Sequence, residues 1–471
     1  MSNMKDTTFS IPQLFGAIGD GIADDTSAIE QAILEAKTQG IALKLPQGEY
    51  KTTRPLLFDQ IDVYCENAKI SFYGLQLNVP AIDMGNDVNV YGKLHIWTVD
   101  NKLSNHGGRC AMGFGEYGSG RGAHRCYIED LTMTGGVPNA NGVLITGDSS
   151  DITFDKVTIP RGTQIGRGIL AHWGNAGDYK VKDPNDRSKG IFPVEGARPT
   201  MHPHDIHVKK LIATGLDDHN GTLGDVSAFF VSAAYNVTVD EIVAEDVRFM
   251  VAITGGDCGL EYATEEERKH GLKNLKFGKL IGKNITTCAA WYCVLSDYLG
   301  NTGFYGELEI GEMELDGAAI AVASHGARKV RIGTVNLKNA KHQAVHFSCH
   351  TTDVEIDTIN LIENCPAEAV YFNRHSDEPA NERIKIHTVN VGNGCGNPSK
   401  DAIFVKIVDG LEIDRLNLNG ASYRSALSVG AECRNIQINQ IENNQSNLSK
   451  VIFEREPIED QNHIIVAAVT R

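Results

Sequence analysis

A short pattern of apolar residues, x-apolar-x-apolar-x-x-apolar-x-apolar, recurs along most of the chain. Copies lie at 151–157, 236–242, 329–335, 353–359, 383–389 and 410–416. The tightest neighbours are roughly two dozen residues apart, a period typical of solenoids. A shorter strand pattern precedes each copy, such as Ala344-Val345-His346-Phe347-Ser348. We expect one turn of the solenoid to be strand, tight turn, bent strand and loop, with each coil burying its apolar side only against its neighbours.

A β-sandwich would also show alternating strands. In-register repetition over so much of the chain favours stacked coils instead, and 48 glycines with only 7% aromatic residues suit many turns between short strands. The chain has 471 residues, and a repeat architecture can make one long domain of that length. We therefore predict an N-terminal segment with a capping helix at 1–50 and an all-β coil domain at 51–471, with loop insertions at about 105–125 and 174–204.

The formal net charge is −16 and no basic stripe is visible, which argues against nucleic acid as a partner. An acidic surface repels anionic membranes, and no stretch is apolar enough to span a bilayer. An acidic polysaccharide stays open as a partner, because a local cluster of basic side chains can override the global field. The first residues show no secretory signal. The ten cysteines form no CxxC pair and are predicted to be buried free thiols.

The opening segment, Phe-Gly-Ala-Ile-Gly-Asp-Gly-Ile-Ala-Asp-Asp-Thr at 15–26, precedes a helix expected from about Asp25 to Lys37. The apolar stripe of this helix is Ala28, Ile29, Ala32, Ile33 and Ala36. Together with Leu-Pro-Gln-Gly-Glu-Tyr at 45–50, the segment resembles the N-terminal cap of the pectate-lyase-like superfamily, which includes polygalacturonases, polysaccharide lyases and phage tailspike depolymerases. The resemblance implies a right-handed parallel β-helix, a polysaccharide substrate, an extracellular or virion location, and a homotrimer as an assembly that tailspikes commonly form.

The resemblance does not extend to one catalytic signature. The paired aspartates of polygalacturonases are missing from 224–229, and Ser324-His325-Gly326 only partly matches their Gly-His-Gly. His202-Pro203-His204-Asp205 is similar to a motif of the alginate epimerase group, with His in place of the first Asp.

In this superfamily the substrate groove runs along the face formed by the first, shorter strand of each coil. The outward side chains of these strands are therefore the candidate site residues. Aligned coils place His325, His350 and His375 in one column, about 4.8 Å apart from coil to coil. Histidine can act as a general base near neutral pH, and tyrosine can donate a proton to a leaving oxygen. For catalysis we single out His172, His325, His350 and Tyr371, with Asp257 and Asp297 as the carboxylate pair that hydrolysis would need. For substrate binding we single out Trp173, Arg198, His204, Tyr292, His346, Arg374, His375 and Lys406.

These residues suit β-elimination from a uronic acid, which needs a base, cations against the carboxylate and an acid for the glycosidic oxygen. The sequence therefore predicts an endo-acting polysaccharide lyase. A glycoside hydrolase, a non-catalytic glycan-binding protein similar to tailspikes, and a C5-epimerase stay open as alternatives. No metal ligands are assigned and no cofactor is required, although a divalent cation stays open.

Overall fold

The computed structural model describes residues 8–74, 80–98, 110–115, 121–135, 140–172, 179–181, 191–193, 202–216, 226–232, 234–254, 272–285, 289–294, 306–348, 350–373, 380–444, 448, 450–454 and 464–470. The chain divides into two compact units, unit 1 (Met1–Glu241 with Asp257–Gly271) and unit 2 (Ile242–Gly256 with Leu272–Arg471).

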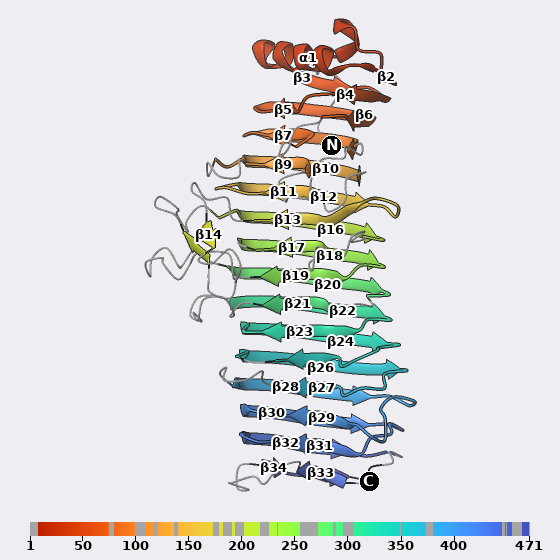
Figure 1. The fold of residues 1–471 in the computed structure, drawn as a ribbon, viewed down its shortest axis with the longest axis vertical. Coiled ribbons are helices and arrows are strands. Elements are labelled where there is room, and N and C mark those ends of the chain that lie inside the picture. The colour runs from red at the N-terminus through yellow and green to blue at the C-terminus, as the bar shows by residue number, and fades with distance from the viewer. Residues whose placement is uncertain are drawn as a thin grey trace. The chain divides into compact units, whose positions relative to one another are not determined.

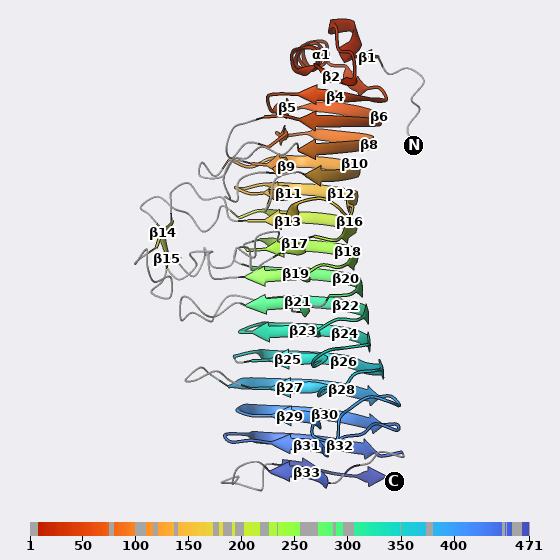
Figure 2. The same ribbon diagram turned by 45° about the vertical axis from the view of Figure 1, so that its right-hand side comes forward.

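Both units are built from the predicted coil. A short strand of one sheet, here sheet B, leads through a turn into a long bent strand of the other sheet, sheet A, and a loop returns to sheet B (Figures 1 and 2). Within each unit the strands of successive coils pair in parallel, as in β26 with β28 and β27 with β29. The predicted all-β class and right-handed parallel β-helix are confirmed.

In unit 1, sheet A contains β1 (Phe9–Ser10), β2 (Asp20–Asp24), β3 (Ala42–Leu45), β4 (Gly48–Thr52), β6 (Ile61–Phe72), β8 (Val88–Thr98), β10 (His124–Gly135), β12 (Ser150–Ile159) and β16 (His204–Thr214). Sheet B contains β5 (Leu56–Phe58), β7 (Ile82–Met84), β9 (Cys110–Phe114), β11 (Ala140–Ile145), β13 (Ile165–Ala171) and β17 (Ser227–Val231). A separate antiparallel pair is formed by β14 (Tyr179–Val181) and β15 (Ile191–Pro193). The residues of β18 (Tyr235–Glu245) are shared between the two units.

In unit 2, sheet A contains β20 (Lys273–Lys283), β22 (Gly306–Asp316), β24 (Arg328–Lys338), β26 (Thr352–Glu363), β28 (Asn381–Val391), β30 (Val408–Leu418), β32 (Arg434–Glu442), β34 (Ile464–Val466) and β35 (Val469–Thr470). Sheet B contains β19 (Phe249–Thr254), β21 (Ala289–Val294), β23 (Ile320–His325), β25 (Val345–Phe347), β27 (Val370–Phe372), β29 (Asp401–Val405), β31 (Ser425–Val429) and β33 (Lys450–Glu454).

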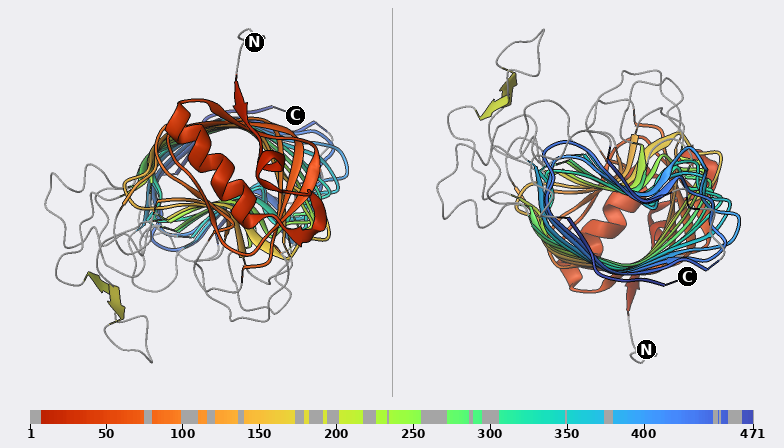
Figure 3. Two further views of the ribbon diagram at one scale, coloured as in Figure 1. Left: turned by 90° about the horizontal axis from the view of Figure 1, so that it is seen from above. Right: turned by 90° about the horizontal axis from the view of Figure 1, so that it is seen from below.

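The recurrent apolar pattern explains the bend in the long strands. In β26 the buried apolar residues are Val354, Ile356, Ile359 and Leu361, so their spacing runs two, three, two. Alternation alone would turn Ile359 outward, because side chains of a strand alternate between its faces. Two outward residues in succession at the middle of the strand let the chain turn a corner, so that both halves face the interior. Figure 3 shows the coils from above and from below, with the strands of the two sheets on opposite sides of each coil.

The capping helix forms as predicted. Helix α1 (Thr26–Gln39) follows a short 3-10 helix η2 (Pro12–Phe15) and lies across the first coils of unit 1 (Figures 1 and 3). All five residues of the predicted stripe are buried. The Asp25 side chain does not cap the helix; its carboxylate instead accepts hydrogen bonds from the backbone N–H groups of Ile18 and Gly19, at 2.7 and 3.1 Å. Asp25 thereby holds the glycine-rich opening segment against the helix.

Seven cysteines lie in the described residues, and all seven are buried free thiols, as expected. The described part of the chain contains no helix with the length and apolar character needed to cross a bilayer.

Candidate functional site

The outer face of sheet B in unit 2 carries a column of aromatic side chains. Alternation in β25 buries Val345 and Phe347 and leaves His346 half-buried on the outside. Strand pairing sets His346 beside Tyr371 of β27, and Tyr371 beside Phe404 of β29. The rings contact one another directly. Those of His346 and Tyr371 meet edge to face at 5.0 Å, and those of Tyr371 and Phe404 stack at 4.7 Å with 18° between planes.

The same face continues toward the first coils of unit 2. Tyr292 of β21 is in register with Ala323 of β23, which is in register with His346. The ring of Tyr292 lies 5.1 Å from that of Phe249, and the Arg248 guanidinium lies 5.4 Å from the Phe249 ring. A cation over an aromatic face is attracted to it.

A second, polar column runs beside the aromatic one and consists of His325, Ser348, Asn373 and Lys406, all half-buried. His325 Nδ1 lies 2.9 Å from the Ser348 hydroxyl. The Asn373 side-chain amide donates to the Tyr371 hydroxyl at 3.5 Å, which joins the two columns. The face thus presents aromatic rings, two hydroxyl groups, an amide, imidazoles and one ammonium group over four neighbouring coils.

The predicted ladder is wrong in the register of His325 against His350. Its third member, His375, lies outside the described residues. Val294 of β21 pairs with His325, and Ala323 pairs with His346, so His325 is level with Ser348. The sequence prediction places His325 level with His350, two residues away. A slip of one residue would move every side chain to the other face, whereas a slip of two keeps each side chain on its face. Alternation could not detect the slip, because the two outward residues of β23 before His325 are both alanines, Ala321 and Ala323.

His350 lies in the turn between β25 and β26, with a left-handed backbone (φ 47°). Its Nε2 is 2.8 Å from Arg328 Nη2. Because a guanidinium can only donate, His350 Nε2 accepts this hydrogen bond, and the lone pair that a general base would use is occupied. Burial lowers the pKa of Arg328 from its ordinary value.

Among the described residues, two of the predicted site residues lie in unit 1. His172 directly follows β13 in sheet B, is half-buried, and donates its backbone N–H to Ile145 at 2.9 Å. His204 begins β16, a strand of sheet A, so it does not share a sheet with His172. Its ring stacks on Tyr235 at 4.6 Å, and its Nδ1 is 2.6 Å from the Asp205 carboxylate.

Six predicted residues lie outside the described residues, together with about half of the loop insertion at 105–125 and most of the one at 174–204. They are Trp173, Arg198, Asp257, Asp297, Arg374 and His375. Their roles stay predictions.

Sequence reasoning missed two buried carboxylates at the opposite end of the sheet B strands. Asp401 at the start of β29 is fully buried and is bound by Arg424 and by the Ser425 hydroxyl, at 3.0 and 2.6 Å to Oδ1. Glu368, before β27, is 2% exposed, and its carboxylate lies 3.2 Å from the Lys400 ammonium. Both carboxylates are neutralised by cations, so neither is an open group for hydrolysis.

A further group of titratable side chains, Glu355, Asp357 and His387, lies on sheet A of unit 2 and was also missed. Among the described residues, this group alone brings three candidate metal ligands together. In the sequence, the only sign of this group is a pair of carboxylate residues, two positions apart in one copy of the repeat, followed by a histidine in the next copy.

Comparison with protein-family models finds no match, and a search of curated proteins finds no significant relative. Solved structures do resemble the chain. The surface adhesin PfbA of Streptococcus pneumoniae is 13% identical, with 97% of this chain and 93% of that chain covered and a TM-score of 0.44. The A-module of an Azotobacter vinelandii mannuronan C-5 epimerase, AlgE6, is 11% identical, with coverage of 95% and 99% and a TM-score of 0.41. A tailspike protein of E. coli bacteriophage HK620, in complex with a pentasaccharide, is 9% identical, with coverage of 94% and 78% and a TM-score of 0.48.

The strand pairing of the chain itself defines it as a right-handed parallel β-helix protein. At these identities and TM-scores the likeness extends no further than the fold. Any function has to be derived from the residues of this chain.

Proposed function

We propose that the protein binds a uronic-acid-containing polysaccharide along the outer face of sheet B in unit 2 and cleaves it by β-elimination. The observation that carries the proposal is the aromatic column of His346, Tyr371 and Phe404 with the polar column beside it. Aromatic side chains suit contact with the apolar faces of sugar rings, and coils about 4.8 Å apart give a polymer repeated contacts along the sheet.

The polar groups match the needs of β-elimination. Lys406 and the Asn373 amide suit the substrate carboxylate, whose neutralisation makes the C5 proton acidic. His346 would take the C5 proton, the electron pair would form the C4–C5 double bond, and the C4–O4 bond would break. Tyr371 would donate its proton to the departing O4. This choice replaces His350 with His346 as the base, because His350 Nε2 accepts a hydrogen bond from Arg328.

The test is a panel of acidic and neutral polysaccharides, with ultraviolet absorbance of the new double bond, reducing ends and viscosity measured in parallel. Polymer cleavage with rising absorbance is expected. Reducing ends without absorbance would indicate hydrolysis, binding without loss of viscosity would indicate a glycan-binding protein, and deuterium exchange at C5 without cleavage would indicate an epimerase. Each of these three results would contradict the lyase.

The Tyr371→Phe variant keeps the ring stack and removes the hydroxyl, which is the proposed proton donor and also accepts the Asn373 hydrogen bond. Its kcat should fall by about 100- to 10,000-fold, the usual contribution of general acid–base catalysis. Tyr64→Phe is the matched control, because Tyr64 lies on sheet A of unit 1 between the rings of Phe9 and Tyr91. Full activity of Tyr371→Phe would remove Tyr371 from the mechanism.

Lys406→Ala should raise KM for acidic polymers more than for neutral ones.

An extracellular or virion location and a homotrimer belong to the same proposal. The homotrimer is tested by light scattering of the purified chain.

A further inference from the structure

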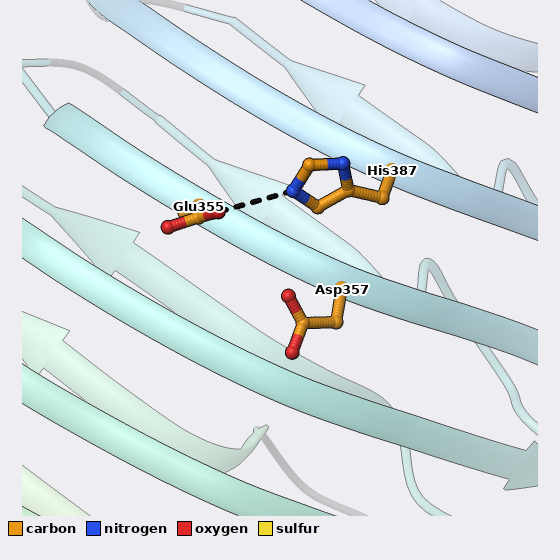
Figure 4. Close-up of side chains that lie close together, drawn as sticks. All are labelled: Glu355, Asp357 and His387. Carbon is orange, nitrogen blue, oxygen red and sulfur yellow. Dashed lines mark hydrogen bonds and ion pairs between the residues drawn. The ribbon is translucent and has the colours of Figure 1, made fainter.

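Three side chains converge on the outer face of sheet A in unit 2, at the corner where the long strands bend. Glu355 and Asp357 come from β26, and His387 comes from the next strand of the sheet, β28. One ligand atom from each lies within 4.8 Å of the other two. Figure 4 shows the two carboxylates and the imidazole directed toward the same region. All three are half-buried, so an ion could reach them from solvent.

A ladder of alternating charge explains the presence of Glu355 but leaves Asp357 unexplained. Pairing sets Glu355 between Arg331 and Lys385, and the same column continues with Glu309 on one side and Glu412 on the other. Asp357 lies in the adjacent column, where its neighbours by register are Gly333 and His387. No described residue donates a hydrogen bond to the Asp357 carboxylate or forms an ion pair with it. A half-buried carboxylate without a compensating cation suits an ion from solution.

His387 is held in an orientation that metal-binding histidines commonly have. Its Nδ1 is 2.7 Å from the Asp414 carboxylate, and its Nε2 is 3.0 Å from Glu355. Asp414 is itself fixed by Lys385 and by the Asn439 amide, which donates to it at 3.0 Å. A carboxylate on the far ring nitrogen fixes the tautomer and the ring direction of a ligating histidine, and it raises the basicity of the ligand. Here that carboxylate comes from a third strand, β30, and Nε2 is turned toward the other two candidate ligands.

We propose that Glu355, Asp357 and His387 form a binding site for a first-row divalent transition-metal ion such as Zn²⁺. One imidazole and two carboxylates suit these ions, whereas Ca²⁺ prefers six to eight oxygen ligands. In a tetrahedral zinc site, ligand atoms are about 3.3 Å apart. His387 Nε2 and Glu355 are 3.0 Å apart, close to that distance, and Asp357, within 4.8 Å of both, would move closer on binding. The fourth position would hold water.

The site is independent of the proposed glycan-binding face, because its residues lie on sheet A and those of the face lie on sheet B. Its test therefore needs no activity. Calorimetric titration of the full chain with zinc chloride at neutral pH should give one bound ion per chain through these residues. Zinc should also raise the melting temperature, because an ion that binds only the folded chain stabilises it.

Two isosteric or nearly isosteric variants locate the ion. Asp357→Asn keeps the shape of the side chain and removes its charge, and His387→Gln removes the imidazole. Each should abolish stoichiometric binding and the zinc-dependent rise in melting temperature. Asp414→Asn leaves all three ligands in place and should weaken zinc affinity by about 10- to 100-fold, as substitutions of outer-shell partners do.

His207→Gln is the matched control. His207 and Asp240 form a similar histidine–carboxylate pair on sheet A of unit 1, with 2.9 Å between Nε2 and Oδ2. The variant should bind zinc as the wild type does. Absence of zinc binding in the wild type, or binding that survives both Asp357→Asn and His387→Gln, would overturn the proposal. Calcium binding that His387→Gln leaves unchanged would overturn the choice of a transition metal.

Discussion

Asp401 has its carboxylate fully buried at the start of β29, where the Arg424 guanidinium matches its charge. Arg424 binds both carboxylate oxygens, with Nε to Oδ1 at 3.0 Å and Nη2 to Oδ2 at 2.5 Å. These hydrogen bonds raise the pKa of Arg424. A charge that is removed from water is tolerated only while its partner stays in place.

The Arg424→Met variant should therefore lose about 3–5 kcal/mol of unfolding free energy, since it leaves the Asp401 charge buried and unmatched. Urea denaturation followed by circular dichroism measures the loss. Arg125→Met is the control, because Arg125 binds Asp87 in the same two-pronged way at 2.6 and 2.8 Å, but with side chains 59% and 47% exposed. That exposed pair should contribute less than about 1 kcal/mol. Equal losses in the two variants would contradict the argument from burial.

At the scale of the element, sheet A of unit 2 is fastened by a ladder of asparagine side chains. Asn336 donates to Glu314, Asn360 to Asn336, Asn390 to Asn360 and Asn417 to Asn390, at 2.6 to 2.8 Å. The strands pair in register at each of these positions. Each amide inside the ladder both donates and accepts, so the ladder opposes any slip between coils.

Asn360→Ala removes two of these hydrogen bonds, and Asn417→Ala removes one. With about 0.5–1.5 kcal/mol for each bond, the first variant should lose about 1–3 kcal/mol and the second about half as much. Chemical denaturation of both variants checks the ratio. If Asn417→Ala lost more unfolding free energy than Asn360→Ala, the hydrogen bonds of the ladder would not be the source of the stability at these positions.

The sequence predicted the face of each strand better than the register between strands. The period of two in β25 correctly turned His346 outward, because burying Val345 and Phe347 leaves no other choice. The alignment of His325 was off by two residues, since nothing in the alanines of β23 distinguishes one coil position from the next. The cluster of Glu355, Asp357 and His387 was missed for a related reason. Two coils must be in known register before residues about thirty apart can be seen as neighbours.

At the scale of the whole chain, the fold could be predicted because two independent signals agree. The cap motif implied the β-helix, and the repeat implied coils that can bury their apolar sides only by stacking. The function could not be predicted as far, because it depends on side chains at a few outward positions. Outward residues are free to vary while the coil stays intact, so the repeat carries no information about them.

The buried thiols allow the stability of each unit to be followed separately. Cys65 and Cys126 lie in unit 1, and Cys293 and Cys433 lie in unit 2, all of them buried. Burial raises the pKa of Cys65 and of Cys126 to about 12, and it raises those of Cys293 and Cys433 as well. The thiolate is the reactive form of cysteine. In the folded chain these residues are therefore protected both by burial, which blocks the reagent, and by the raised pKa, which keeps the thiol protonated.

Pulsed alkylation in increasing urea, read by mass spectrometry, should therefore find these four thiols unreactive in the native protein. Within a unit they should become reactive together, since a coil that loses its neighbour also loses the surface that buries its apolar side. Reaction of Cys293 well before Cys433 would show that the coils of unit 2 separate one by one. Reaction of Cys65 or Cys126 without urea would contradict their burial in unit 1.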